Sequence, residues 1–83
     1  MTMTNIEQRL LQIVNVYKES DTGVHLDMNL YEDLRLDSLS LTEMIVACED
    51  EFKIEIDMDH PDTRNARTVR DLYNGILLLT GSN

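Results

Sequence analysis

The 83-residue sequence carries 16 Asp and Glu against 7 Lys and Arg, which gives a net charge of −9. A chain of this length predicts one small domain, residues 1–83, with a thin hydrophobic core. The negative charge argues against nucleic acid and anionic membranes as partners and favours basic proteins.

The sequence lacks the patterns of a membrane span, a signal peptide, a disulfide and a metal site. No apolar run is long enough to span a membrane and no signal-peptide pattern opens the chain, so we expect a cytoplasmic protein. The single cysteine, Cys48, excludes an internal disulfide and lies in an apolar stripe, which predicts a core residue. His25 and His60 lack metal-ligand spacing. The Asp57-x-Asp59 pair lacks the glycine and closing glutamate of a calcium loop, so no metal site is predicted.

The first predicted helix covers residues 5–18 and opens with a capping box, Thr4-x-x-Glu7. Its apolar residues recur at helical spacing: Ile6, Leu10, Ile13, Val14 and Tyr17. A long loop, residues 19–36, follows, and loops of this length in compact domains are often functional. Its apolar side chains should pin it across the core, and they are Val24, Leu26, Leu30, Leu34 and Leu36.

The second predicted helix covers residues 38–52, and its pattern separates two stripes at roughly 100° per residue. The stripe expected to face the core contains Leu41, Met44, Ile45, Cys48 and Phe52. The stripe on nearly the opposite side contains Leu39, Glu43, Val46 and Asp50. Scattered exposed apolar residues are ordinary. Here they alternate with acids along one line, which favours a face that binds a partner.

The last third of the chain predicts a link, a short helical turn and a third long helix. Residues 53–56 alternate in polarity, but no second strand pattern exists to pair with them, so an extended link is favoured. Residues 57–66 contain the only proline, Pro61, and predict a short irregular helical turn. Thr68-x-x-Asp71 caps the last helix, whose apolar face contains Val69, Leu72, Tyr73, Ile76 and Leu79.

Two glycines in this last helix have different expected effects. Gly75, inside the helix, costs roughly 1 kcal/mol relative to Ala. Gly81 is placed to cap the C-terminus. The fold class is therefore all-α: a small bundle of three main helices plus one short helix, with a long loop between the first and second helices.

Ser38 stands at the junction between the long loop and the second helix. Either Asp37 or Ser38 can cap that helix, which leaves the other side chain spare. A serine hydrolase needs a base and an oxyanion hole. Ser38 lies in no Gly-x-Ser-x-Gly frame, and a bundle this small has little room for a substrate cleft. We therefore expect Ser38 to be modified rather than catalytic, and we assign no catalytic residue and no enzymatic activity.

Residues 30–39, LYEDLRLDSL, resemble the acyl carrier protein signature, in which a DLGxDSL segment carries the phosphopantetheine serine. The resemblance runs through residue 56, and the segment that begins at Thr68 resembles the start of the family's last helix. It implies a stand-alone carrier domain in which Ser38, preceded by Asp37, receives a 4'-phosphopantetheine arm from coenzyme A. The arm's thiol then holds acyl groups as thioesters.

The same resemblance implies partners. These are a magnesium-dependent phosphopantetheinyl transferase and acyl-chain-processing enzymes with basic docking patches, all of which would meet a monomeric carrier. The recognition helix of the family maps onto Leu39, Glu43, Val46 and Asp50, the stripe found above from spacing. Asp37 rather than His before the serine resembles fatty-acid and polyketide carriers more than peptidyl carriers.

Two positions depart from the family pattern. Arg35 stands where the family usually has glycine, a residue that permits unusual backbone angles. It adds a cation beside Ser38 that either contacts the arm's phosphate or a partner, or has no role. Cys48 is smaller than the usual apolar residue and alters the space available to an acyl chain. The alternative function is an acidic helical adaptor of carrier-like fold that takes no arm. A calcium-responsive module is a third reading, against which the incomplete loop argues.

Overall fold

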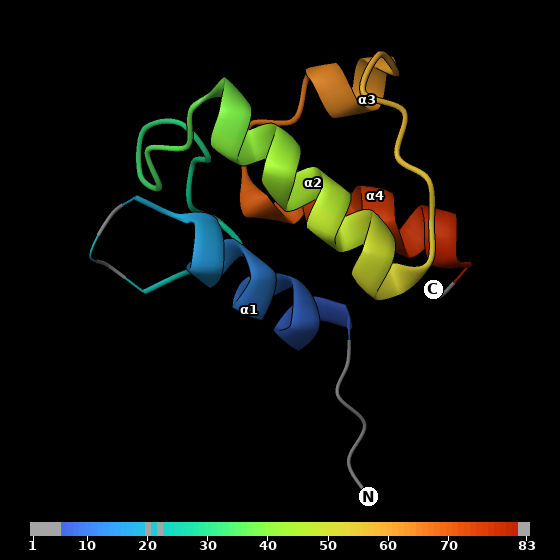
Figure 1. Ribbon diagram of the computed structural model, residues 1–83, viewed down its shortest axis with the longest axis horizontal. Helices are drawn as coiled ribbons and strands as arrows, with labels where there is room; N and C mark the ends of the chain where they lie inside the picture. The colour runs from blue at the N-terminus through green and yellow to red at the C-terminus, as the bar shows by residue number, and fades with distance from the viewer. Residues whose placement is uncertain (1–5, 20, 22, 82–83) are drawn as a thin grey trace, which may run out of the picture.

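The computed structural model describes residues 6–19, 21 and 23–81, and these form an all-helical structure (Figure 1). Its three longer helices are α1 (Ile6–Tyr17), α2 (Ser38–Phe52) and α4 (Val69–Thr80), and a single turn, α3 (Pro61–Arg64), precedes α4. No helix in the described part of the chain has the length and apolar character needed to cross a bilayer. The predicted capping of the first helix by Thr4, and its start at Asn5, lie outside the described residues.

The core lies where α1 packs against both α2 and α4. In the view of Figure 1, α2 runs in front of α4 and α1 lies below both. The buried cluster contains Leu10, Val14, Leu30, Leu34, Leu36, Met44, Cys48, Phe52, Val69 and Ile76. Within the described residues no strand forms, and the backbone pairing between Asn29 and Thr68 is an isolated bridge. The all-helical prediction is therefore confirmed.

The long loop between α1 and α2 is held to the core by its leucines, as predicted. Leu30, Leu34 and Leu36 are buried, and Val24 and Leu26 pack against the core. The loop also satisfies backbone groups locally, because the Asn29 side chain accepts hydrogen bonds from the backbone N–H groups of Tyr31 at 2.8 Å and Glu32 at 2.9 Å. A loop with buried leucines and a satisfied backbone can hold a fixed shape up to the first residue of α2.

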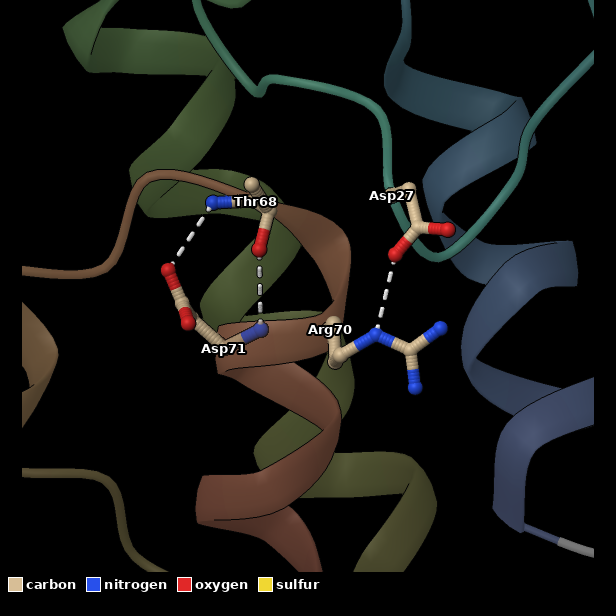
Figure 2. Close-up of polar contacts among 4 residues, drawn as sticks. All are labelled: Asp27, Thr68, Arg70 and Asp71. Atoms are coloured by element: carbon tan, nitrogen blue, oxygen red, sulfur yellow. Dashed lines mark hydrogen bonds and ion pairs between the residues drawn. The ribbon is translucent and has the colours of Figure 1, made fainter.

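The same loop is tied to the start of α4 by backbone hydrogen bonds. The N–H of Leu30 donates to the carbonyl of Arg67, and the N–H of Val69 donates to the carbonyl of Met28. Figure 2 shows the adjoining ion pair, in which the Arg70 guanidinium meets the Asp27 carboxylate at 3.0 Å. Both side chains of this ion pair are largely exposed, so its contribution to stability is small. The backbone bonds are what fix the loop beside α4.

The start of α4 has the capping box that the sequence predicts. The Thr68 hydroxyl accepts a hydrogen bond from the Asp71 N–H at 3.2 Å, and the Asp71 carboxylate accepts from the Thr68 N–H at 3.1 Å (Figure 2). Gly81 caps the other end with φ of 75°, also as predicted. Leu79 departs from the predicted apolar face, because it is 51% exposed. Among the described residues, no element covers this side chain fully.

The segment after α2 is an extended link, as predicted. Lys53 ends α2 in the left-handed region, with φ of 58°. The Glu49 side chain then accepts a hydrogen bond from the Ile56 N–H at 2.7 Å, which draws the link back along the helix. On the other side of α2, Arg9 of α1 donates to the Glu51 carboxylate at 2.8 Å and lies 4.7 Å from the Phe52 ring centroid. The C-terminal end of α2 is thus fixed on two sides.

Candidate functional site at the start of α2

Asp37 is the residue that caps α2. Its backbone is extended, and its Oδ1 accepts a hydrogen bond from the Ser40 N–H at 2.8 Å. Donation by the Ser40 backbone N–H, followed by that of the Ser40 side chain, lowers the pKa of the Asp37 carboxyl below its usual value. The carboxylate therefore stays ionised at the positive end of the helix dipole. The choice between Asp37 and Ser38 that the sequence left open is resolved in favour of Asp37.

Ser38 is the first residue of α2, and its side chain is exposed. Its carbonyl accepts a hydrogen bond from the Thr42 hydroxyl at 2.8 Å. Its own hydroxyl has no hydrogen-bond partner among the residues that the structure describes. Because backbone N–H groups at a helix start favour phosphate, an exposed free hydroxyl at this position suits a phosphodiester. The residues present therefore fit a phosphopantetheine arm.

Arg35, three positions before Ser38, adopts the left-handed conformation, with φ of 61°. This is the position at which the carrier pattern usually has glycine, and the backbone requirement that glycine would meet is still present. Its guanidinium is exposed and forms no ion pair with any residue in the described part of the chain. A basic residue with a left-handed backbone therefore stands three positions before the free hydroxyl, and backbone outliers of this class cluster at functional sites.

The four residues predicted to share one face of α2 are all exposed. Leu39 is 68% exposed and Val46 is 55% exposed, and Glu43 and Asp50 are exposed between and beyond them. The opposite stripe is buried, with Met44, Ile45, Cys48 and Phe52 in the interior and Leu41 packed against it. The predicted division of α2 into an inner and an outer face is confirmed.

A pocket of about 330 Å³ lies between α2 and α4, and the segment that joins them also lines it, at Ile56, Thr63, Asn65 and Ala66. Its walls include Ile45 and Cys48 from α2 and Leu72, Gly75 and Ile76 from α4. The sequence analysis did not predict it. The signal available was the presence of two small residues, at positions 48 and 75, on helix faces that otherwise carry large apolar side chains.

Cys48 is buried, as predicted, and it forms part of the pocket wall. Burial, and then the negative charges of Glu51 and Glu49, raise the pKa of the Cys48 thiol to about 12. A thiol that stays protonated is a poor nucleophile. Cys48 is therefore a small apolar wall residue.

The acidic segment before α3 uses its carboxylates in the fold. The Asp57 side chain accepts a hydrogen bond from the Asp59 N–H at 2.9 Å, and the Asp57 carbonyl accepts from the His60 N–H. These bonds form the turn that leads into α3. Over residues 6–19, 21 and 23–81, no group of three or more His, Cys, Asp or Glu side chains is placed to hold a metal ion.

Comparisons with known proteins agree on one family. The family model for the phosphopantetheine attachment site matches residues 7–76. Acyl carrier proteins from three serovars of Chlamydia trachomatis are 42% identical over 64 residues, which cover 77% of this chain and 80% of theirs. A protein of Mycobacterium tuberculosis described as an acyl carrier protein has a solved structure that matches with a TM-score of 0.78 and 31% identity. The match covers 89% of this chain and 97% of that one.

The family match covers the free serine with its capping aspartate, the whole of α2, nearly all of α1 and the first two turns of α4. Proteins of this family are carriers rather than enzymes, and the group that they carry is phosphopantetheine. The chain belongs to the acyl carrier protein family.

Proposed function

We propose that Ser38 is the residue to which phosphopantetheine is attached. The observation that carries this proposal is that Asp37 and Ser38 have different roles at the start of α2. Asp37 caps the helix, and the neighbouring Ser38 hydroxyl is exposed and has no partner among the described residues. A hydroxyl that the fold does not use is available to react without loss of structure.

The attachment reaction is a phosphoryl-type transfer from coenzyme A. The Ser38 Oγ–P bond forms while the P–O bond of the coenzyme's pyrophosphate breaks. The nucleotide bisphosphate leaves, and the hydroxyl proton passes to the transferase. Backbone N–H groups in the first turn of α2 stabilise the negative charge on the new phosphodiester. The bound arm supplies a terminal thiol that holds acyl groups as thioesters.

The test is incubation with a promiscuous phosphopantetheinyl transferase, magnesium and coenzyme A, followed by intact mass measurement. Wild type gains one phosphopantetheine, and Ser38→Ala gains none. Ser40→Ala is the matched control, because Ser40 is the other serine in the first turn of α2. This variant is modified like wild type. An unmodified wild type would instead support the alternative, an adaptor of carrier fold that takes no arm.

The proposal extends to the outer face of α2 as the surface that meets partner enzymes. Leu39 and Val46 supply apolar contact, and Glu43 and Asp50 steer a basic docking patch. Electrostatic steering acts mainly on the association rate and fades with salt. Glu43→Lys therefore slows arm transfer, and the deficit is largest at low ionic strength. Val46→Ala weakens binding with little dependence on salt.

The matched control for the face is Glu55→Lys, which makes the same charge reversal at an exposed position on the link outside α2. It leaves the transfer rate much closer to that of wild type. Circular dichroism checks that each variant stays folded. Equal rates for Glu43→Lys and Glu55→Lys would indicate that net charge, rather than this face, governs recognition.

The proposed pathway is fatty-acid or polyketide biosynthesis, and the pocket between α2 and α4 supports an apolar acyl cargo. A monomer is supported by the net charge of −9, which opposes association of two copies. We also take the single turn α3 to be the counterpart of the short helix expected in the carrier bundle.

A further inference from the structure

The pocket between α2 and α4 has unusually small residues at two of its wall positions. Cys48 projects from the buried face of α2, and Gly75 lies at the middle of α4. The neighbouring wall residues Ile45, Leu72 and Ile76 are large and apolar. The space between the helices is therefore left open at positions 48 and 75 rather than filled.

The backbone conformation at position 75 does not require a glycine. It lies inside a helix and does not adopt positive φ, in contrast to Gly81. A Cβ atom added to Gly75 would meet no other atom within 4 Å. Glycine inside a helix is destabilising relative to alanine. The fold would thus be more stable with alanine at this position, and the remaining consequence of glycine is the missing side chain in the pocket wall.

The rim of the pocket carries apolar side chains that the fold leaves in solvent. Leu78 is 74% exposed and Leu79 is 51% exposed, and both line the pocket at the C-terminal half of α4. The apolar part of the pocket wall therefore includes the exposed Leu78 and Leu79 as well as the buried Cys48. An apolar chain that lies along this part of the wall would cover side chains that otherwise face water.

We propose that Gly75 is a specificity-determining residue of this carrier, because the space it leaves admits medium-length and long acyl chains to the pocket between α2 and α4. This inference rests on the proposed attachment of the arm at Ser38. The occupant is the acyl chain carried on that arm. A larger side chain at position 75 fills the part of the pocket that glycine leaves open and restricts the pocket to short acyl chains.

The experiment loads wild type, Gly75→Ala and Gly75→Leu with butyryl, octanoyl or dodecanoyl arms from the matching acyl-coenzyme A, using a promiscuous transferase. Intact mass confirms loading before any other measurement. The readout is the melting temperature of each acylated form minus that of the same variant with an unacylated arm. A ligand that binds only the folded state raises this temperature.

In wild type the gain in melting temperature rises from butyryl through octanoyl to dodecanoyl. In Gly75→Leu the butyryl gain remains and the further gain from longer chains is lost. Gly75→Ala melts at a higher temperature than wild type without an acyl chain, because α4 gains helix propensity. It loses part of the further gain from dodecanoyl chains, so it still tests the inference if Gly75→Leu folds poorly, and an undiminished dodecanoyl gain in Gly75→Ala would then count against it.

Gly23→Leu is the matched control. Gly23 lies in the loop, has open space around it and is not part of the pocket wall. This variant retains the chain-length dependence of wild type. The inference is overturned if Gly75→Leu and wild type show the same dependence, or if loaded wild type gains no stability from longer chains. If wild type takes no arm, the mass measurement shows this before any melting experiment, and the proposed attachment at Ser38 is wrong. That result is distinct from a failure of the inference about Gly75, which appears only in the melting temperatures.

Discussion

The helices α2 and α4 both begin with a polar side chain that caps the helix, but their first turns use polar side chains differently. At α4, Thr68 and Asp71 bond to each other's backbone N–H groups, so both polar side chains serve the fold (Figure 2). At α2, Asp37 caps alone, and the adjacent Ser38 hydroxyl is left without a partner in the described part of the chain. The residue at the third helical position explains the difference, since α4 has Asp71 there and α2 has Ser40.

The two helices also end differently. Both C-caps are left-handed, but α4 ends with Gly81, which adopts that conformation without strain, and α2 ends with Lys53. The other non-glycine residue with positive φ among the described residues is Arg35, just before the start of α2. The helix that carries the proposed attachment site is thus flanked by backbone strain, whereas the left-handed cap of α4 is a glycine.

The largest expected effect comes from removing the α4 capping box. The double variant Thr68→Ala/Asp71→Ala loses the bonds from the Asp71, Thr68 and Arg67 N–H groups. We expect a loss of about 2 kcal/mol in the free energy of unfolding. Urea denaturation of the double variant and both single variants measures the coupling within the box. If the losses of stability in Thr68→Ala and Asp71→Ala add up to the loss in the double variant, the hydrogen bonds of the two side chains do not act as a unit.

Removing the single cap of α2 has a smaller expected effect. Asp37→Ala loses the hydrogen bond from the Ser40 N–H, the hydrogen bond from the Ser40 hydroxyl and the favourable charge at the helix start. We expect a loss of about 1 kcal/mol, again measured by urea denaturation. A loss as large as that of the α4 double variant would mean that the two helix starts are equally important to the fold, contrary to the comparison.

Relieving the strain at position 35 should stabilise the protein. A non-glycine residue in the left-handed region costs roughly 1–2 kcal/mol, and the greater freedom of glycine in the unfolded chain offsets about half of that gain. Arg35→Gly therefore raises the free energy of unfolding by about 0.5–1 kcal/mol. Lys53→Gly is the matched control, since it relieves the same conformation at the other end of α2. A destabilised Arg35→Gly beside a stabilised Lys53→Gly would reveal a stabilising contact of the Arg35 side chain.

The fold was largely predictable from sequence, because its signals are local. The Thr68-x-x-Asp71 box, the Gly81 cap, the buried loop leucines and the two faces of α2 all follow from spacing within one segment. The features that were missed depend on how distant segments are placed. The pocket requires α2 and α4 to be set side by side, and the Arg9–Glu51 bond joins residues 42 positions apart. The exposure of Leu79 likewise depends on which distant segments pack over α4, and in the described part of the chain none covers it fully.

Acid should lower the stability that the α4 capping box contributes, but by less than removal of the box does. Hydrogen bonds from the Arg67 N–H, and then from Thr68, lower the pKa of the Asp71 carboxyl below its usual value. A group with a lowered pKa in the folded state stabilises the protein above its unfolded pKa and loses that contribution as the pH falls through the folded pKa. The stability difference between wild type and Asp71→Asn is therefore constant near neutral pH and shrinks below about pH 4. A difference that stays unchanged down to pH 2 would contradict this.

The smallest expected change in stability is that of Ser38→Ala. The side chain is exposed, its hydroxyl has no partner among the described residues, and the Asp37 cap does not depend on it. Alanine is also the best helix former. We therefore expect the free energy of unfolding to change by less than about 0.5 kcal/mol, while attachment of the arm is lost completely. Ser40→Ala is compared in the same urea titration, because its hydroxyl helps to hold the Asp37 carboxylate ionised. A loss above about 1 kcal/mol for Ser38→Ala would show that its hydroxyl caps α2 in solution. Polar side chains would then serve the fold at the N-termini of both α2 and α4, contrary to the comparison.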